Sequence, residues 1–295
     1  MKTFIVKAPA TSANLGPGYD CLGLALSLFS EFEFAESGSL RIEGCPLEYQ
    51  NEDNLVLKAF RKAFEAAGEQ TPALHLTIRA QVPVARGLGS SSTCIAAGLF
   101  GANAFLGGRL SREQLFALAT EMEGHPDNAA PCIYGGLTAS FLEEGGPHMV
   151  PFSCHPDWRF VTVIPDYEVH TEEARRVVPQ EISLKTGVSA VSHAIAVVRA
   201  LEQGDEALLR LSARDVLHEP YRKALIRDYE AARKTALSGG AAAFLISGSG
   251  SAMLAPVLGE QKAEAVYDAL KTAFPKAQTL CLRAVSEGIS VKEEV

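Results

Sequence analysis

The run Pro83–Thr93, P-V-A-R-G-L-G-S-S-S-T, contains the residue types that could hold phosphate groups. Gly87 and Gly89 let the backbone turn tightly and approach a ligand without a Cβ in the way. We expect the three serines that follow to cap the next helix and to offer hydroxyls to phosphate oxygens or Mg²⁺. A helix start also favours negative charge, so the run predicts a triphosphate cradle. Taken alone, the same pattern also suits a plain capped turn between a strand and a helix.

Two familiar phosphate loops do not match this run. A Walker-type loop needs a Lys directly after its last Gly, and no Gly-Lys pair occurs in the chain. A dinucleotide-binding fingerprint needs a third Gly where Ser92 stands. The cradle therefore belongs to another class of phosphate loop.

Carboxylate and amide side chains gather after a second predicted helix, at residues 111–123. Its end brings Glu123 towards the loop His125–Asn128. Mg²⁺ prefers few protein oxygens plus substrate phosphates, so one carboxylate and one serine hydroxyl are enough to hold it. Phosphoryl transfer asks for charge neutralisation and positioning, which these groups could supply. The alternative for Glu123 is a solvated carboxylate at a helix end, which is our interpretation of Glu121.

The loop motif at residues 83–92 resembles the ATP loop of the GHMP kinases, named after galactokinase, homoserine kinase, mevalonate kinase and phosphomevalonate kinase. Two longer motifs look like the first and middle motifs of the homoserine kinase branch: A-P-A-T-S-A-N-L-G-P-G-Y-D-C-L-G at Ala8–Gly23 and E-G-H-P-D-N-A-A-P-C-I-Y-G-G at Glu123–Gly136. I-S-G-S-G-S-A-M at Ile246–Met253 is similar to the family's third Gly-rich motif. The four motifs occur in the family's order and cover most of the chain.

The resemblance implies an α+β fold with the two-domain GHMP kinase architecture. It implies an N-terminal ATP-binding α+β domain with a left-handed βαβ unit, over residues 1–150. It also implies a C-terminal ferredoxin-like α/β sandwich, over residues 151–295. Gly and Pro residues cluster near Pro147–Pro156, which suits a boundary there.

The resemblance further implies ATP and Mg²⁺, with Ser91 and Glu123 as the metal ligands. The catalytic group would be Glu123, Asp127 and Asn128. The residues themselves leave Asp127 open between a general base and a group that fixes its own loop. The nucleotide would lie against the whole cradle: Pro83, Val84, Ala85, Arg86, Gly87, Leu88, Gly89, Ser90, Ser91, Ser92 and Thr93.

By the same resemblance the substrate is L-homoserine and the product is O-phospho-L-homoserine, on the route to threonine. A carboxylate suits the planar fork of Arg. T-x-x-A-R ends at Arg175 and H-E-P-Y-R ends at Arg222, and both match the family pattern. Asp20 is the expected partner of the substrate's polar end, with Asn14 and His125 assisting. Without the motifs, Arg222 would fit a surface charge and Asn14 a turn residue.

Two other functions stay open: a mevalonate-type GHMP kinase and a catalytically silent sensor of the same fold. The N-terminal motif and the two arginines argue against mevalonate, and the intact pair of Glu123 and Ser91 argues against the sensor. One departure is Arg227-Asp228, where many relatives have Pro-Gly.

Composition favours a soluble cytoplasmic enzyme that binds neither nucleic acid nor membrane. The 295 residues carry a net charge of −8, and Lys and Arg are dispersed. The six cysteines form no C-x-x-C pair and suit core thiols in a reducing compartment. The start of the chain shows no signal-peptide core, and glycines interrupt the uncharged stretch Thr235–Gly259, which we interpret as strand, loop and strand. A homodimer is expected by family analogy.

Alternating strands and helices must position these groups. Ser111 and Gln114 predict a capping box at the start of the second helix. Strands are predicted at residues 4–8, in the following stretch to about 43, and at 74–82, 160–164, 241–246, 252–257 and 278–284. Helices are predicted at residues 54–67, 94–105, 111–123, 189–201, 221–237 and 262–274.

Overall fold

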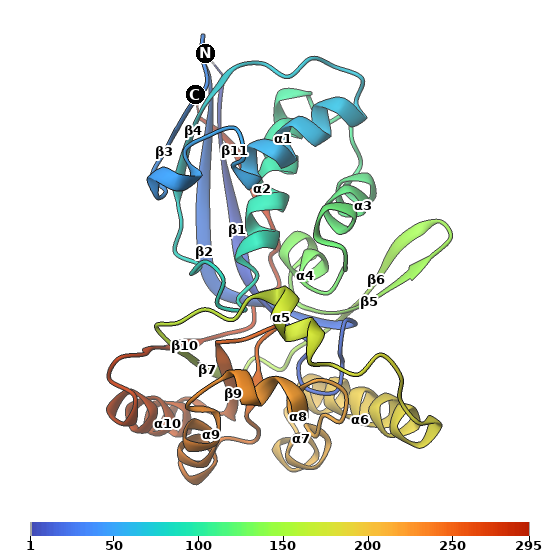
Figure 1. Cartoon of the computed structure of the whole chain (residues 1–295), viewed down its shortest axis with the longest axis vertical. Coiled ribbons are helices and arrows are strands. Elements are labelled where there is room, and N and C mark those ends of the chain that lie inside the picture. Colours follow the sequence, from blue (N-terminus) through green and yellow to red (C-terminus); the bar gives the residue numbers. More distant parts are fainter. Residues whose placement is uncertain (1, 295) are drawn as a thin grey trace.

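The computed structural model describes residues 2–294 and shows two lobes, one above the other (Figure 1). Each lobe has its own β-sheet with helices packed against it. This mixed arrangement confirms the predicted α+β class with two domains.

The first lobe is built on a seven-stranded sheet. Its strand order is β11 (Ser290–Glu294), β1 (Thr3–Ala13), β2 (Leu22–Glu36), β4 (Leu74–Arg79) and β3 (Arg41–Glu43), while β5 (Leu137–Glu143) pairs with β2 and with β6 (Gly146–Phe152). β3 and β4 run parallel, and α1 (Leu55–Ala66) connects them as a βαβ unit.

The helices α1, α2 (Ser90–Phe105), α3 (Arg112–Glu123) and α4 (Ala129–Tyr134) cover one face of this sheet (Figure 1). α2 carries no charged residue and lies inside the core, where Ile95 and Leu99 are buried. α1 is amphipathic and turns Phe60 and Phe64 towards the same core. Ser111 and Gln114 form a capping box on α3, which confirms that prediction.

The second lobe is built on an antiparallel sheet in the order β10 (Gln278–Leu282), β7 (Trp158–Ile164), β9 (Met253–Leu258) and β8 (Leu245–Ile246). Every residue of β7 is buried, so both faces of this sheet are covered. The covering helices are α6 (Leu184–Gln203), α7 (Glu206–Ser212), α8 (Glu219–Arg222), α9 (Tyr229–Ser238) and α10 (Glu260–Ala273). α5 (Thr171–Arg176) lies at the junction of the lobes (Figure 1).

The two lobes are interleaved in the chain. β11, the last strand, returns to the first lobe and pairs antiparallel with β1. The division at residue 150, which stays a prediction, falls within β6. The Gly and Pro cluster that suggested a linker instead begins this strand of a hairpin, and β5, β6 and β11 were not predicted individually.

Several predicted element bounds are wrong. The strand predicted to run to residue 82 ends at Arg79, although Val82 stays buried and its N–H donates to Ser30 Oγ at 3.1 Å. The helix predicted at 221–237 is broken into α8, a 3₁₀ turn at Lys223–Leu225, and α9, with Arg227 in the gap. Of the strand predicted at 241–246, only Leu245–Ile246 pairs with a neighbour. Local propensity could not show these breaks, because tertiary contacts decide them.

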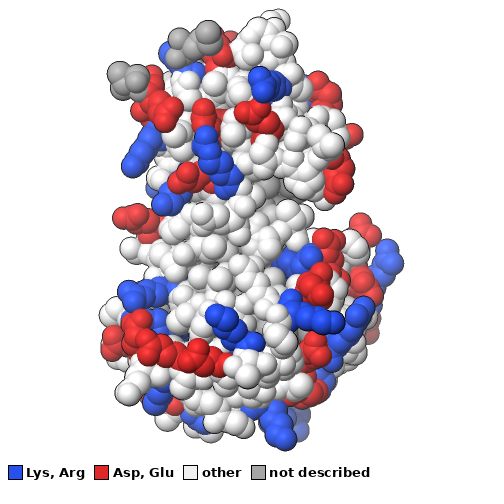
Figure 2. Space-filling view, turned by 90° about the vertical axis from the view of Figure 1, so that its left-hand side faces the viewer, with Lys and Arg blue, Asp and Glu red and all other residues white. Residues whose placement is uncertain are grey.

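The surface shown in Figure 2 carries Lys and Arg interspersed with Asp and Glu on both lobes, with an uncharged band between them. The stretch Thr235–Gly259 forms the end of α9, then β8, a loop and β9, as predicted. Within residues 2–294, α6 is the one helix long and apolar enough to cross a membrane by length and composition, and only 28% of its most apolar window is buried.

Candidate active site

A cavity of about 660 Å³ opens where the two lobes meet. One end is lined largely by apolar side chains, among them Phe32, Tyr49, Val56 and Ile78. The phosphate loop lines the middle, and polar residues of both lobes line the other end. The volume is within the range of small-molecule sites, so the cavity could hold a nucleotide and a small acceptor together.

The phosphate loop enters the cavity because two of its glycines adopt left-handed backbone angles. Gly87 has φ +78° and Gly89 has φ +69°. A Cβ on Gly89 would lie 1.9 Å from Thr11 Oγ1, and one on Gly87 would lie 2.2 Å from the Ser247 carbonyl oxygen. Neither position has room for a side chain. The close approach of β1 and of the 247–251 loop therefore requires both glycines.

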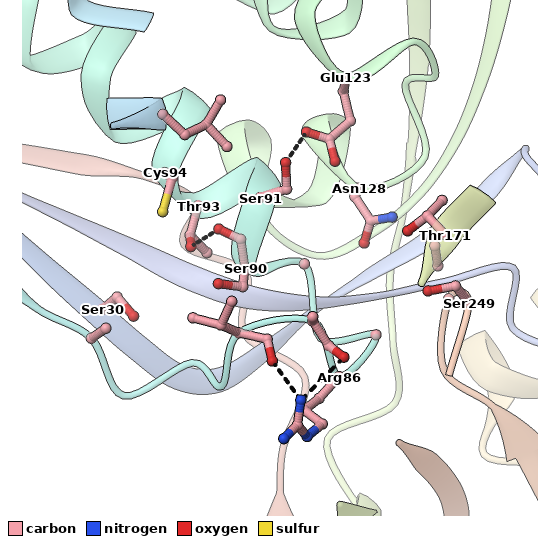
Figure 3. Close-up of a pocket in the computed structure, with 18 of the residues that line it drawn as sticks. Ser30, Arg86, Ser90, Ser91, Thr93, Cys94, Glu123, Asn128, Thr171 and Ser249 are labelled. Atoms are coloured by element: carbon pink, nitrogen blue, oxygen red, sulfur yellow. Dashed lines mark hydrogen bonds between the residues drawn. The ribbon is translucent and has the colours of Figure 1, made fainter. Parts of the chain in front are cut away.

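The three serines do not cap α2, which corrects the prediction. The N-cap is Gly89, no side chain of the described residues caps the helix, and the serines form its first turn (Figure 3). The first backbone N–H groups of a helix have no partner within the helix, and its dipole is positive at that end. The loop therefore presents an uncapped helix start to the cavity, which suits an anion better than the predicted arrangement.

The third Gly-rich motif fastens the phosphate loop from below. The Ser247 hydroxyl donates to the Gly87 carbonyl at 2.7 Å, and the Ala252 N–H donates to the Arg86 carbonyl at 2.9 Å. Gly248 N–H donates to the Ala13 carbonyl at 3.2 Å. These bonds link the motif of the second lobe to two motifs of the first.

Arg86 lines the cavity, but its guanidinium points away from the helix start (Figure 3). It donates to the carbonyls of Pro165 and Asp166 at 3.2 and 3.3 Å, and it pairs with Glu168 at 2.9 Å. Arg86 therefore ties the loop to the second lobe.

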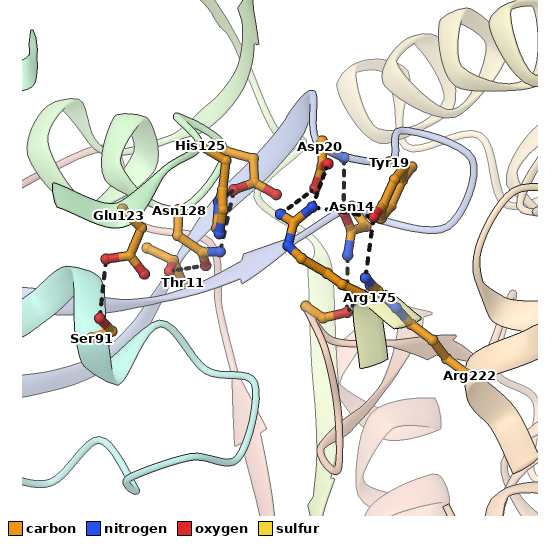
Figure 4. Close-up of polar contacts among 12 residues, drawn as sticks. Thr11, Asn14, Tyr19, Asp20, Ser91, Glu123, His125, Asn128, Arg175 and Arg222 are labelled. Carbon is orange, nitrogen blue, oxygen red and sulfur yellow. Dashed lines mark hydrogen bonds and ion pairs between the residues drawn. The ribbon is translucent and has the colours of Figure 1, made fainter. Parts of the chain in front are cut away.

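Glu123 and Ser91 face each other across the start of α2. The Ser91 hydroxyl donates to Glu123 Oε2 at 3.1 Å (Figure 4). Burial raises the pKa of the Glu123 carboxyl, while His125 and Ser91 oppose that rise. Glu121, two residues earlier on α3, points to solvent and pairs with Lys62 at 2.9 Å. The structure thus separates the cavity carboxylate from its solvated neighbour.

The loop after α3 forms a chain of hydrogen bonds beside Glu123 (Figure 4). His125 Nδ1 and Asp127 Oδ1 lie 2.5 Å apart, and Asn128 Nδ2 donates to the same Asp127 oxygen at 3.4 Å. Thr11 Oγ1 donates to Asn128 Oδ1 at 2.6 Å. Burial opposes charge on His125, but the hydrogen bond and charge of Asp127 outweigh it and raise the pKa of His125.

An arginine clamp, Arg175 of α5 and Arg222 of α8, occupies the far end of the cavity (Figure 4). Arg175 forms a two-pronged ion pair with Asp20, with distances of 3.0 and 3.1 Å. Arg222 is buried and donates to the carbonyls of Ala174 and Gly248 at 3.0 and 3.1 Å. Burial lowers the pKa of Arg222, and Tyr19 and Asp20 oppose this.

Asn14 holds the loop that carries Asp20. Its Nδ2 donates to the Gly248 carbonyl at 2.9 Å, and its Oδ1 accepts from the Asp20 N–H at 3.0 Å. The side chain therefore ties a turn to the third Gly-rich motif while it also lines the cavity.

Sequence reasoning missed Tyr19, which lies between the two arginines. Its hydroxyl accepts from Arg175 Nη1 and from Arg222 Nη2, each at 3.4 Å. The Arg222 guanidinium lies 5.0 Å from the centre of the Tyr19 ring. The only signal in the sequence was the position of Tyr19 inside the first motif. Thr11, under Gly89, was missed for the same reason.

The structure gathers most of the predicted site residues around one cavity. Pro83, Leu88 and Ser92 do not line it, because Leu88 and Ser92 are buried in the protein and Pro83 precedes the bend. The residues that do line it are Asn14, Asp20, Val84, Ala85, Arg86, Gly87, Gly89, Ser90, Ser91, Thr93, Glu123, His125, Asp127, Asn128, Arg175 and Arg222. Their roles stay predictions.

Comparison with known families identifies this combination of fold and cavity. The family models "GHMP kinases N terminal domain" and "GHMP kinases C terminal" match residues 54–136 and 197–276. The chain belongs to the GHMP kinase family.

Within that family its relatives are homoserine kinases. The homoserine kinase of Clostridium beijerinckii is 42% identical over 268 residues, which cover 90% of this chain and 89% of that protein. The homoserine kinase of a Synechococcus species is 43% identical over 286 residues, which cover 95% of this chain and 93% of that protein.

Solved structures agree in fold. The homoserine kinase of Cytophaga hutchinsonii superposes with a TM-score of 0.87 at 27% identity, covering 98% of this chain and 97% of its own. The L. major mevalonate kinase superposes with a TM-score of 0.72 at 15% identity, covering 96% of each chain, and this similarity shows the fold alone. The chain thus groups with the homoserine kinases, while the fold by itself does not select the acceptor.

Proposed function

We propose that the protein transfers the γ-phosphoryl group of ATP to the side-chain hydroxyl of L-homoserine and releases O-phospho-L-homoserine, a step towards threonine. The observation that carries this proposal is the single cavity that joins an uncapped helix start to an arginine clamp with an acidic partner. The homoserine kinase relatives, at 42% and 43% identity over most of both chains, support the choice of acceptor.

ATP lies along the phosphate loop in this proposal. The backbone N–H groups at the start of α2 bind the phosphates, and the apolar end of the cavity takes the base. Tyr49 and Val56 line that end, and Asn54 beside them caps α1 by accepting the Val56 N–H at 3.0 Å. The terminal phosphate is thereby directed towards the clamp.

The donors present fit Mg²⁺. Among residues 2–294 no group of three or more His, Cys, Asp or Glu side chains could hold a metal. An ion at Glu123 and Ser91 would therefore complete its shell with phosphate oxygens and water, which is the usual habit of Mg²⁺. When bound, the ion neutralises charge on the transferring phosphoryl group.

The substrate end is charge-matched to an amino acid. Arg175 and Asp20 already form a pair of opposite charges. A zwitterionic substrate carries the same two charges, so its carboxylate can bind the arginines and its ammonium can bind Asp20. The hydroxyl then points towards Asn128 and the phosphate loop.

Asp127 acts by positioning in this proposal. One of its oxygens is shared by His125 and Asn128, which both line the cavity. Phosphoryl transfer with a loose transition state depends mainly on alignment and electrostatics. Asp127 therefore orients the two side chains that meet the substrate.

A cytoplasmic location and a homodimer complete the proposal. All six cysteines are free, as expected of a reducing compartment. Neither the location nor the oligomeric state follows from the site.

A coupled assay of ADP release tests the proposal with Mg·ATP and, in separate reactions, L-homoserine, mevalonate or no acceptor. Turnover that depends on L-homoserine is the expected result. Turnover with mevalonate alone would keep the fold and overturn the clamp assignment. Absence of turnover with either acceptor, while ATP still binds in calorimetry, would favour a silent sensor.

A further inference from the structure

One face of α6 is apolar although it is exposed. Leu184, Val188, Val191 and Ile195 are 86%, 61%, 62% and 67% exposed, and we call them the α6 stripe. The opposite face of the helix is also apolar and is buried in the second lobe through residues such as Val197 and Leu201. An exposed apolar stripe on a helix that already has a buried face is unusual for a free surface.

The spacing of the stripe matches helix pairing. Its members follow one another at intervals of four, three and four residues, which is the heptad pattern of two helices packed side by side. Ile182 extends the stripe at its start, because its Cδ1 lies 3.8 Å from where a Cβ on Gly187 would be. Gly187 and Ser192, beside the stripe, leave room for a second helix to approach.

The charges at the two ends of the stripe are opposite. Glu181 is exposed just before the helix, and Arg199 is exposed one turn after Ile195. In an antiparallel pair that sets Leu184 against Ile195 and Val188 against Val191, residue numbers that face each other sum to about 379. Glu181 of one copy then falls beside Arg199 of the other, and the reverse holds at the opposite end. The stripe is therefore complementary to itself.

A membrane fits this stripe less well. Helices that lie on membranes carry many Lys or Arg residues on their polar face. α6 has Lys185 and Arg199, while its remaining polar positions are mainly Ser and Thr. Insertion of the whole helix would remove Val197 and Leu201 from the core of the lobe.

We infer that the α6 stripe is the surface through which two copies of this chain associate, with their α6 helices antiparallel about a two-fold axis. The interface is apolar at its centre and has two Glu181–Arg199 contacts at its ends. This inference does not depend on the reaction, because no stripe residue lines the cavity.

Sedimentation velocity of the full chain over about 1–100 µM tests the inference. The wild type is expected to be a dimer in that range, and Val191→Glu, at the centre of the stripe, is expected to be a monomer. Leu47→Glu is the matched control, since Leu47 is an equally exposed apolar residue of the first lobe, at 85%. A monomeric wild type, or a dimer that survives Val191→Glu, would overturn the inference. Circular dichroism checks that each variant is folded, and Ile195→Ser replaces Val191→Glu if that variant is not.

Charge reversal gives a second readout that leaves the apolar centre intact. Arg199→Glu alone and Glu181→Arg alone should each weaken the dimer several-fold, since each places like charges in contact, and the double reversal should restore it. Failure of the double variant to recover would contradict the antiparallel register. Flotation with phosphatidylcholine and phosphatidylglycerol vesicles is the last arm. Binding that Val191→Glu abolishes, from a wild type that stays monomeric, would assign the stripe to a membrane instead.

Discussion

The phosphate loop is one continuous run of the chain, whereas the arginine clamp joins three separate segments. The loop lies in the first lobe and presents backbone N–H groups at the start of α2. The clamp takes Asp20 from the first lobe and Arg175 and Arg222 from the second, and it works through side chains. The first region can form whenever its own helix forms. The second exists only when the two lobes are docked.

The two regions also hold their backbones differently. Ala85 in the loop has φ +53°, while Asn14 and Asp20 near the clamp have φ +72° and +55°, angles that non-glycine residues seldom adopt. Ala85 lies next to a motif rich in glycine. Asn14 is held by its long-range bond to the Gly248 carbonyl. Such strain persists where surrounding contacts over-determine the backbone, so the clamp depends on contacts between lobes.

Replacement of Glu123 by Ala should have the largest effect, on the phosphate side alone. We expect kcat to fall by at least about 10²–10³-fold, because a preorganised electrostatic contact to the transferring group is lost. Steady-state kinetics with varied Mg²⁺ would measure it, and the KM for L-homoserine should change little.

Glu121→Ala is the matched control, because it removes a carboxylate from the same helix end outside the cavity. It should leave kcat near the wild-type value. Equal losses in the two variants would show that α3, rather than the Glu123 carboxylate, had been perturbed.

Arg222→Lys should break the clamp while it leaves the loop intact. Lys keeps the charge but cannot reproduce the bonds of the guanidinium fork to Ala174, Gly248 and Tyr19. Unpaired buried groups cost about 1–3 kcal/mol each, so the KM for L-homoserine should rise by about 10–100-fold. The KM for ATP should stay unchanged.

Arg176→Lys is the control for this variant. Arg176 is the neighbour of Arg175 on α5, its side chain is 77% exposed, and it pairs with Glu172. Its KM values should match those of the wild type. A rise in the KM for ATP in Arg222→Lys would mean that the two regions are not separable.

The contrast between the regions also explains what the sequence could reveal. The loop was predicted at the correct place because Gly87, Gly89 and the serines are adjacent in the chain. The capping role given to the serines was wrong, since spacing alone does not show that Gly89 itself takes the left-handed N-cap position.

The clamp was less predictable. Arg175 and Arg222 were found through motifs, but their bonds depend on segments more than 150 residues away, as in the Arg175–Asp20 pair. Tyr19 has no charge and no local periodicity to mark it, although it contacts both arginines. The break between α8 and α9 was missed for a related reason, since packing of the lobe decides it.

Asp127→Asn should change the pH dependence of the acceptor end. Asp127 raises the pKa of His125, so His125 keeps its proton to a higher pH than an ordinary histidine does. Removal of the negative charge should lower this pKa, so that the proton is lost at lower pH. NMR titration of the His125 ring would show the shift directly, and kcat/KM for L-homoserine should begin to fall at lower pH in the variant. An unchanged titration would contradict the positioning role of Asp127, whereas a pH-independent loss of kcat by 10²-fold or more would favour a general base.

Tyr19→Phe should have the smallest effect and is the finest test of the clamp. The change removes one hydroxyl and keeps the ring that lies against Arg222. Its two hydrogen bonds are long, at 3.4 Å each, so the loss should be at the low end of about 0.5–1.5 kcal/mol. The KM for L-homoserine should therefore rise by about two- to tenfold with kcat preserved. Tyr19→Leu also removes the stacked ring and should raise that KM further. If both variants bound L-homoserine as the wild type does, the arginines would be held by Asp20 and the backbone carbonyls alone, and the clamp would need no contribution from Tyr19.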